Sequence, residues 1–395
     1  MPNFVQIYKS TDANSPVLPG QVSKLVDLLD AILVNGYTTA AVTGITRTSG
    51  TATATLTVAN TTLVTGDYVT ISGATQTEYN GTFQITVTSS TTFTYAVTGT
   101  PTTPATGTIL YKKAALNWTK PYTGTNAAVF RSQNTASPRH YLQIIDNAAT
   151  AGGAKEAQVS AFEVMTAYNT GTGQFPTLAQ QASNLCWFKS NTADGTARAW
   201  TVIGDDKGFY IQLNSAGTVA TTNFYGFGWF PSYKAGDAYN TFITGATTFN
   251  TNQATGGGGL ILCSTWVATN SLPAAAVGIY LARSYSQTGG SILCALLPGI
   301  GTSGTFGAGS SGTAYPEAIT SGVVVAPTFI AEVIAGTPLR GRLPGFFPPQ
   351  HNNSFSNYDE LSGISGLSGL TLVVQTQNNQ GNPSQVSIDR IGPWA

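Results

Sequence analysis

Hydrophobic residues recur at every second position through much of the chain, and this pattern predicts short β-strands. It is clearest in segment 43–108, where 25 of the 66 residues are threonine. Apolar residues alternate there in the runs 53–58, 68–71, 82–87 and 92–97, which are separated by turn clusters such as Asn80-Gly81. Threonine suits an extended backbone and keeps an uncharged sheet face hydrated. The segment is therefore predicted to be a small all-β module of four or five strands.

A helical period precedes this module, between Pro19 and Asn35. The apolar residues that fall on one helical stripe are Val22, Leu25, Val26, Leu29, Ile32 and Leu33. Pro19 lies near the start of the stripe and Gly36 just beyond its end, which is the usual punctuation of a helix. The sequence therefore predicts one N-terminal helix over 19–35.

The edges of the threonine-rich segment indicate an insertion. Joining residues 34–37 directly to 116–119 gives a helix, a turn and a strand, so the host is complete without the block. An insertion at an exposed loop tip is simpler than tandem domains. We expect a β-rich host domain of residues 1–40 and 113–395, with a division near 235 left open, and an inserted module at 41–112. The expected fold class is mainly β: a β-sandwich or jelly-roll-like host with one N-terminal helix, plus the small all-β module.

Further strands are predicted in the host. The runs 141–146 and 208–213 alternate as half-buried strands do, and 200–211 predicts a hairpin around the turn 204–208. The acidic residues of that turn could hold calcium, although a solvated hairpin tip is the commoner role. The glycine-rich segment 299–312 predicts a low-complexity loop. Segment 340–351, rich in proline and glycine, predicts an extended arm.

Segment 224–233 contains six aromatic residues in ten positions. Two glycines alternate with three of them, which leaves one strand face nearly bare and able to pack closely against another sheet. A core or subunit interface is therefore favoured over a platform for stacking sugars. Together with two residues of the arm, these aromatics form the candidate interaction surface: Tyr225, Phe227, Trp229, Phe346 and Phe347.

Charge narrows the possible partners. Only 9% of residues are charged, against roughly 25% in average soluble domains. The 17 basic and 17 acidic residues leave no excess of positive charge, so we expect no direct contact with nucleic acid. Because the net charge is near zero, electrostatic repulsion between copies of the chain is weak. We therefore expect the protein to be part of an assembly. There is no secretory signal at the N-terminus and no apolar run of membrane-spanning length, so membrane insertion is not expected.

The search for chemistry gives no catalytic, cofactor-binding or metal-binding residues. The three cysteines are widely spaced, which argues against a disulfide scaffold or a zinc site: Cys186, Cys263 and Cys294. His140 and His351 accompany no nucleophile motif and are expected to be structural. Glycoside hydrolysis needs two carboxylates across a cleft, and the clustered acids are Glu156 and Glu163, Asp205 and Asp206, and Asp359 and Glu360. The sequence does not place any such pair in a groove, and we expect a protein that is not an enzyme and binds no cofactor.

Two sets of segments resemble known families. The stretch 69–83 with its Glu-Tyr-Asn-Gly order, followed by Phe93-Thr94-Tyr95, resembles a small Ig-like β module that recurs inside bacteriophage tail and other virion proteins. Segments 8–13, 118–126 and 340–345 of the host resemble uncharacterised structural proteins of tailed phages. The first resemblance covers about a sixth of the chain, and the landmarks of the second span most of it.

The resemblance implies a virion protein, assembled in the bacterial cytoplasm and released by lysis. The expected function is a non-enzymatic structural component on the outside of the capsid or on the tail and baseplate. Its expected partners are other virion proteins and further copies of itself in a trimer or hexamer. The alternative is a tail protein that binds a receptor or host surface polysaccharide and could also depolymerise it. Capsid and tail locations both remain open at this point.

Overall fold

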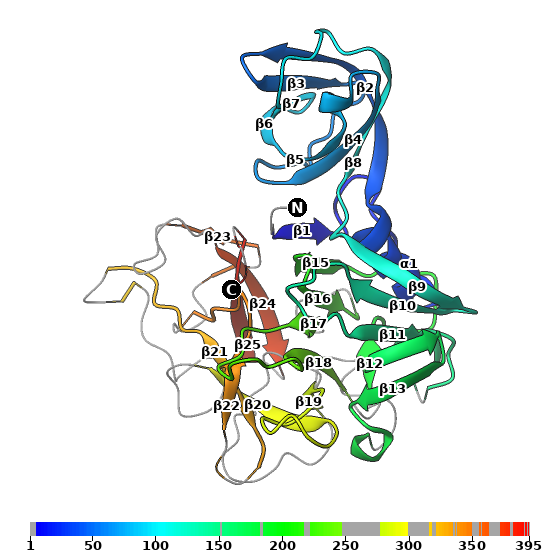
Figure 1. Ribbon diagram of the computed structural model, residues 1–395, viewed down its shortest axis with the longest axis vertical. Helices are drawn as coiled ribbons and strands as arrows, with labels where there is room; N and C mark the ends of the chain where they lie inside the picture. The colour runs from blue at the N-terminus through cyan, green and yellow to red at the C-terminus, as the bar shows by residue number, and fades with distance from the viewer. Residues whose placement is uncertain are drawn as a thin grey trace.

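The computed structural model is mainly β, as the sequence predicts. Its described part forms three antiparallel sheets that curve into a half-barrel and a near-barrel, with a single short α-helix (Figure 1). The residues described are 5–150, 152–181, 185–216, 222–246, 277–298, 316–317, 321–334, 336, 338–349, 355–356, 358–362, 372–379, 382–390, 392 and 394. Two features expected from the sequence, Cys263 and the loop 299–312, lie outside them, as does His351.

The largest sheet belongs to the host and has 15 strands. Their bounds are β1 Gln6–Lys9, β9 Trp118–Gly124, β10 Ala127–Ser132, β11 Tyr141–Ile145, β12 Glu156–Ala167, β13 Thr170–Phe175, β14 Cys186–Phe188, β15 Trp200–Gly204, β16 Gly208–Asn214, β17 Thr222–Trp229, β18 Thr241–Ala246, β19 Val277–Leu281, β20 Ile292–Pro298, β21 Thr328–Glu332 and β22 Leu339–Arg342. The main path runs β1-β15-β16-β17-β18-β14-β12-β11-β10-β9, with β13 beside β12 and β19 to β22 continuing from β18.

The central strands are buried on both faces, so the expectation of half-buried strands at 141–146 and 208–213 was wrong. In β16, Phe209 and Ile211 join one apolar cluster, the inner core, whereas Tyr210 joins a second, the outer core. The alternating polar residues are enclosed and bonded rather than solvated. In β11, for example, buried Gln143 donates to the Tyr168 carbonyl at 2.6 Å.

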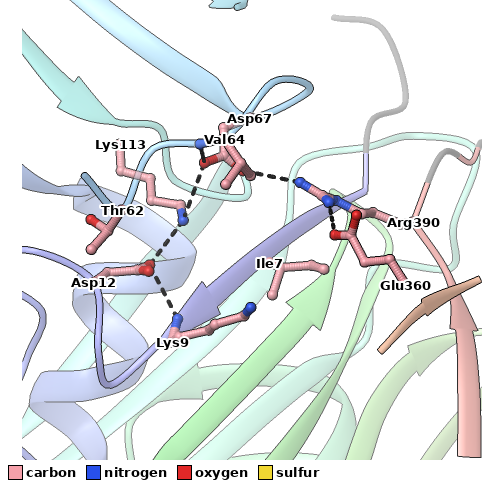
Figure 2. A pocket seen from close by; sticks show the side chains of 9 residues that line it. All are labelled: Ile7, Lys9, Asp12, Thr62, Val64, Asp67, Lys113, Glu360 and Arg390. Carbon is pink, nitrogen blue, oxygen red and sulfur yellow. Dashed lines mark hydrogen bonds and ion pairs between the residues drawn. The ribbon is translucent and has the colours of Figure 1, made fainter. Parts of the chain in front are cut away.

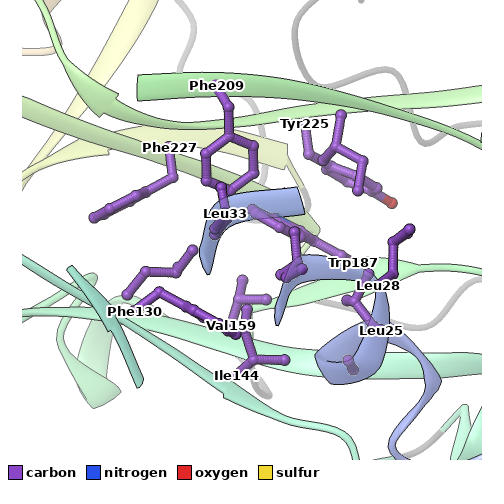
Figure 3. Packing of buried hydrophobic residues seen from close by; sticks show 14 of the residues in the cluster. Leu25, Leu28, Leu33, Phe130, Ile144, Val159, Trp187, Phe209, Tyr225 and Phe227 are labelled. Atoms are coloured by element: carbon purple, nitrogen blue, oxygen red, sulfur yellow. The ribbon is translucent and has the colours of Figure 1, made fainter. Parts of the chain in front are cut away.

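The helix lies inside the curve of the host sheet and packs into the inner core (Figure 3). It comprises α1 Lys24–Asp30 and a π-helical turn, Ala31–Asn35. The prediction that it begins at residue 19 was wrong. Ser23 has φ 68°, in the left-handed region, and Leu18 forms a β-bridge with Arg198, so the chain becomes helical only at Lys24. The remaining short helices are 3-10 turns: Thr77–Tyr79, Gly153–Lys155 and Leu178–Gln180.

The outer core is covered by the C-terminal part of the chain. A three-stranded sheet forms there from β23 Glu360–Leu361, β24 Leu372–Asn379 and β25 Asn382–Asp389. Val386 and Ile388 of β25 enter the outer core together with Phe346 and Trp394. Part of the predicted arm is therefore regular structure: its first residues belong to β22, which pairs with β21.

The inserted segment forms its own seven-stranded sheet, drawn at the top of Figure 1. Its strands are β2 Tyr37–Thr48, β3 Thr51–Leu56, β4 Tyr68–Ala74, β5 Gly81–Gln84, β6 Thr86–Ser89, β7 Thr92–Ala96 and β8 Gly107–Lys113. They follow the order β5-β4-β8-β2-β3-β7-β6 around a separate apolar core that includes Ile45, Val69, Tyr79 and Phe93. The buried residues of this core all belong to the inserted segment.

The host sheet is continuous across residue 235. Strand β17 on one side of this position pairs with β18 on the other, with Phe227 opposite Ile243 and Trp229 opposite Thr241. Since hydrogen-bonded neighbours of one sheet share the same cores, the structure does not divide the host there.

Candidate functional site

A cavity lined by several charged side chains lies where the module meets the host (Figure 2). Strands β2 and β8 leave the host side by side, with Tyr37 opposite Lys113, and form a two-stranded stalk. The loop 62–67 of the module turns back toward the host beside this stalk. We call the contact region between module and host the junction.

A buried ammonium is the centre of the junction. The Lys113 Nζ lies 2.8 Å from Oδ2 of Asp12, which follows β1, and 3.6 Å from Oδ2 of Asp67, which belongs to the module. All three side chains are at most 7% exposed. Because an unpaired buried charge is costly, each of these residues depends on the others for its place. We call Asp12, Asp67 and Lys113 the junction triad.

The C-terminal sheet extends this network. The Arg390 guanidinium lies 3.9 Å from Asp67 and makes a closer ion pair with Glu360 of β23. Together with Lys9 of β1, these groups and the triad line a cavity of about 60 Å³. Three parts of the sequence that are far apart therefore supply one chain of alternating charges, and Figure 2 shows their side chains converging.

Uncharged hydrogen bonds also join module and host. The Gln6 side chain of β1 donates to the Ala114 carbonyl at 3.0 Å and accepts the backbone N–H of Tyr68 at 3.2 Å. The backbone N–H of Ala13 donates to the Thr62 hydroxyl at 3.0 Å. The module is thus tied to β1 and its following loop at several separate points.

Burial governs the protonation of the junction. It raises the pKa of the Asp67 carboxyl, an effect that the nearby Lys113 and the backbone N–H of Val64 only partly oppose. Burial and the Asp12 carboxylate raise the pKa of the Tyr37 phenol, which donates to Asp12 at 2.6 Å. The Lys9 ammonium, partly buried over the Tyr358 ring, has a lowered pKa for the same reason of burial. The acids and bases are engaged with one another, so the arrangement is suited to holding two bodies together.

The candidate interaction surface from the sequence lies mostly inside the host. Tyr225 and Phe227 are in the inner core and Phe346 is in the outer core, all essentially inaccessible to solvent. Trp229 and Phe347 are half-buried, and Trp229 lies beneath the Lys207 ammonium at 4.1 Å. Three of the five aromatic side chains are buried in the cores of this one chain, because burial of apolar surface is favourable. The five residues therefore do not form a common exposed surface.

The turn 204–208 joins β15 and β16 in the predicted hairpin, but its tip is not solvated. Asp205 is buried and accepts the backbone N–H groups of Lys207 and Gly208 at 2.8 and 2.9 Å. Burial raises the pKa of Asp205 to about 7. The Lys207 ammonium donates to the Trp394 carbonyl, so the tip is fixed against the C-terminal segment. A polar sequence was misread as solvated because its partners are distant along the chain.

The other titratable candidates have structural surroundings. His140 is buried between the rings of Phe175 and Tyr239, and burial lowers its pKa to about 4. Cys186 and Cys294 are buried thiols, and burial raises the pKa of both. The clustered acids are engaged individually: Glu163 pairs with Arg283, Glu156 accepts the Gly152 N–H, Asp359 accepts the Ser356 N–H and Glu360 pairs with Arg390.

The junction was missed by reasoning from the sequence. The chain is only 9% charged, yet Lys113 lies directly at the edge of the inserted segment, whereas Asp67 lies well inside it. A rare charge at such an edge is a usable signal of a polar contact. The partners of Lys113, Asp12 and Asp67, are distant in sequence and could not have been assigned without the fold.

No protein-family model matches the chain, and no curated protein is significantly similar to it.

In the part of the chain that the structure describes, no cluster of three or more His, Cys, Asp or Glu side chains is arranged to hold a metal ion. The described residues also include no helix whose length and hydrophobicity would let it cross a bilayer.

Proposed function

We propose that this chain is a non-enzymatic structural subunit of a tailed-phage virion, in which the host domain holds the threonine-rich module in a fixed orientation. The observation that carries the proposal is the junction: a module with its own core is joined to the host by a covalent stalk and by buried ion pairs. A module that moved freely relative to the host would need only the covalent stalk. Fixed display of a module is a mechanical task and requires no reaction.

The expected environment is the outside of the capsid or the tail and baseplate, where copies of the chain associate with one another and with other virion proteins. Support comes from the resemblance of segments 69–83 and 118–126 to virion proteins and from the low charge of the chain. The alternative, a polysaccharide-binding tail protein, is weaker because Tyr225 and Phe227 are buried and offer no platform for stacking sugars.

Quantitative mass spectrometry of purified particles of the phage that encodes the chain tests the proposal. Hundreds of copies per particle would indicate capsid decoration, and a small multiple of three or six would indicate a tail or baseplate position. Absence from washed particles would contradict a structural role. Incubating the purified chain with host polysaccharide supplies the second arm, in which released oligosaccharides would overturn the non-enzymatic assignment.

A further inference from the structure

Among the lysines that the structure describes, only Lys113 forms ion pairs with two carboxylates. Its Nζ lies 2.8 Å from Oδ2 of Asp12 and 3.6 Å from Oδ2 of Asp67, and all three side chains are at most 7% exposed. An amine, a carboxyl group and a second carboxylate are therefore held in contact away from bulk water. These are the groups that amide formation needs: a nucleophile, an acyl group and a group that transfers protons.

The Asp12 carboxyl group is also polarised by other donors. Its Oδ2 accepts the Tyr37 phenol at 2.6 Å and the backbone N–H of Lys9 at 3.1 Å. Attack on the carboxyl carbon places negative charge on this oxygen, and donors that already point at it stabilise that charge. The Lys9 ammonium lies over the Tyr358 ring, 4.6 Å from its centre, so Lys113 is the amine that contacts Asp12.

We propose that Lys113 and Asp12 form an intramolecular isopeptide bond, with Asp67 as the catalytic residue. The ammonium first gives a proton to the Asp12 carboxylate, which leaves a neutral amine beside a carboxylic acid whose hydroxyl oxygen is Oδ1. Nζ then attacks Cγ of Asp12 and forms the C–N bond, while the Asp67 carboxylate accepts one proton from the nitrogen. Asp67 returns this proton to the hydroxyl oxygen, the C–O bond breaks and one water leaves. The net reaction converts one ammonium and one carboxylate into one amide and one water.

The surroundings of the triad favour this reaction. Two reactants that are held in contact react as if at an effective concentration of about 10⁵ M or more. Burial raises the pKa of the Asp67 carboxyl, so its carboxylate accepts a proton more readily than an exposed one does. The adjoining cavity has about 60 Å³. Since roughly 10–15 Å³ is enough for one water, the leaving water has a place.

The bond joins the loop after β1 to the end of β8, at positions 101 residues apart. It therefore fixes the base of the stalk to the host. Because Asp67 belongs to the module, the bond forms while the module is docked. Each chain reacts once and with itself, so the bond is a modification and not an enzymatic turnover. It requires only the folded junction and goes beyond the proposed virion role.

The ion pair of Lys189 with Asp146 provides an internal comparison. Both side chains are completely buried, yet among the described residues Lys189 pairs with no second carboxylate. This pair lacks the proton acceptor that Asp67 supplies to Lys113. We therefore expect it to remain an ion pair.

Mass spectrometry of the denatured full chain tests the bond. We expect the chain to be lighter than its sequence by one water. A succinimide at Asp194-Gly195 would also lose one water, so the bond has to be located in a peptide. Trypsin should release residues 10–24 joined to 113–131, because the Lys113 amine is blocked and Lys120 precedes a proline. A full chain without this branched peptide would overturn the bond.

Three variants test the roles of the groups. Lys113→Arg keeps the positive charge but has no nucleophilic amine, so the branched peptide should be lost. Asp67→Asn keeps both reactants and should slow bond formation after cell-free synthesis by roughly 10²-fold or more. Glu78→Gln, at an exposed carboxylate of the same module, should leave the rate unchanged. A cooperative thermal transition of each variant shows that it is folded.

An unchanged rate in Asp67→Asn would overturn the catalytic role of Asp67. An equal yield of a peptide that joins Lys189 to Asp146 would overturn the requirement for a second carboxylate. Copy number in particles is measured independently, so the virion role and the isopeptide bond can fail separately.

Discussion

Single side chains hold the interior of this weakly charged protein together through a few buried ions. Arg340 is the clearest case, because its guanidinium donates to Glu332 at 2.5 Å and to Asp237 at 2.7 Å, with all three side chains at most 1% exposed. It also donates to the Arg283 carbonyl. This cluster joins β22, β21 and the loop before β18. A residue that the sequence places in an extended arm is therefore part of the core.

Replacing Arg340 by methionine should lower the free energy of unfolding by about 3–5 kcal/mol, since two buried carboxylates would lose their counter-ion. Denaturant unfolding of the purified chain measures the loss. Lys24→Met is the matched control, because the pair of Lys24 with Asp27 is exposed and should contribute less than about 0.5 kcal/mol. Equal effects of the two substitutions would contradict the assigned role of burial.

His140 should make the protein sensitive to acid. Burial lowers its pKa to about 4, so the folded state resists a proton that the unfolded chain accepts near pH 6.5. Stability from this group is present above pH 6.5 and is lost as the pH falls toward 4. Between pH 7.5 and 5 the wild type should lose about 2 kcal/mol more than His140→Gln does. Unfolding curves at the two pH values measure this, and parallel losses would show that another group is responsible.

At the scale of elements, alternation of apolar residues was enough to predict a mainly β chain and the hairpin around 204–208, and a helical period was enough to predict the single helix. It was not enough to tell half-buried strands from fully buried ones, because Gln143 looks solvent-facing until its partner, the Tyr168 carbonyl, is known. The start of the helix was predicted wrongly for a similar reason, since Leu18, just before it, forms a β-bridge with the distant Arg198. The local sequence pattern predicts whether a segment is a helix or a strand. The exact ends of the element and the burial of its side chains depend on contacts with residues that are distant in sequence.

The pairing of β16 with β17 depends on two opposed glycines. Gly208 lies opposite Gly228, which has φ 150°, and a Cβ on Gly228 would come within 2.2 Å of the Gly208 Cα. Gly228→Ala should therefore destabilise the host by about 1–3 kcal/mol or more, since neither backbone can yield without breaking the pair. Gly195→Ala is the control, because its Cβ would meet only a side-chain atom at 3.6 Å. Similar melting temperatures for both variants would refute the close approach.

The whole molecule is a large host sheet with a core on each face and a second body with a core of its own. The sequence predicts two bodies because the threonine-rich composition changes sharply at the edges of the segment. It could not show how they are joined, since the junction gathers residues near positions 12, 67, 113 and 390. An insertion that looks like a passenger is tied to its host by buried ion pairs.

The cores of the two bodies share no residue, so the host should fold without the module. Strand register gives a clean excision: Ala40 lies opposite Tyr111, and Ala41 opposite Leu110. Replacing 41–110 with Asn-Gly, a favoured two-residue hairpin turn, would close β2 onto β8. This variant loses Asp67 but keeps Lys113 beside Asp12, which leaves one buried ammonium with one carboxylate.

We therefore expect a cooperative thermal transition for the excised host, with inner and outer cores intact, and no pH dependence from the Asp67 carboxyl. Calorimetry measures the first. The second is measured by comparing the change in unfolding free energy between pH 5 and 8 in the excised host with that in the full chain, because His140 is present in both. The same excision with Lys113→Met is the informative comparison. It removes the remaining counter-ion of buried Asp12 and should cost about 3–5 kcal/mol if the junction stays closed. A host that melts without cooperativity even when Lys113 is kept would mean that the module, through its docking contacts, is required for the host to fold.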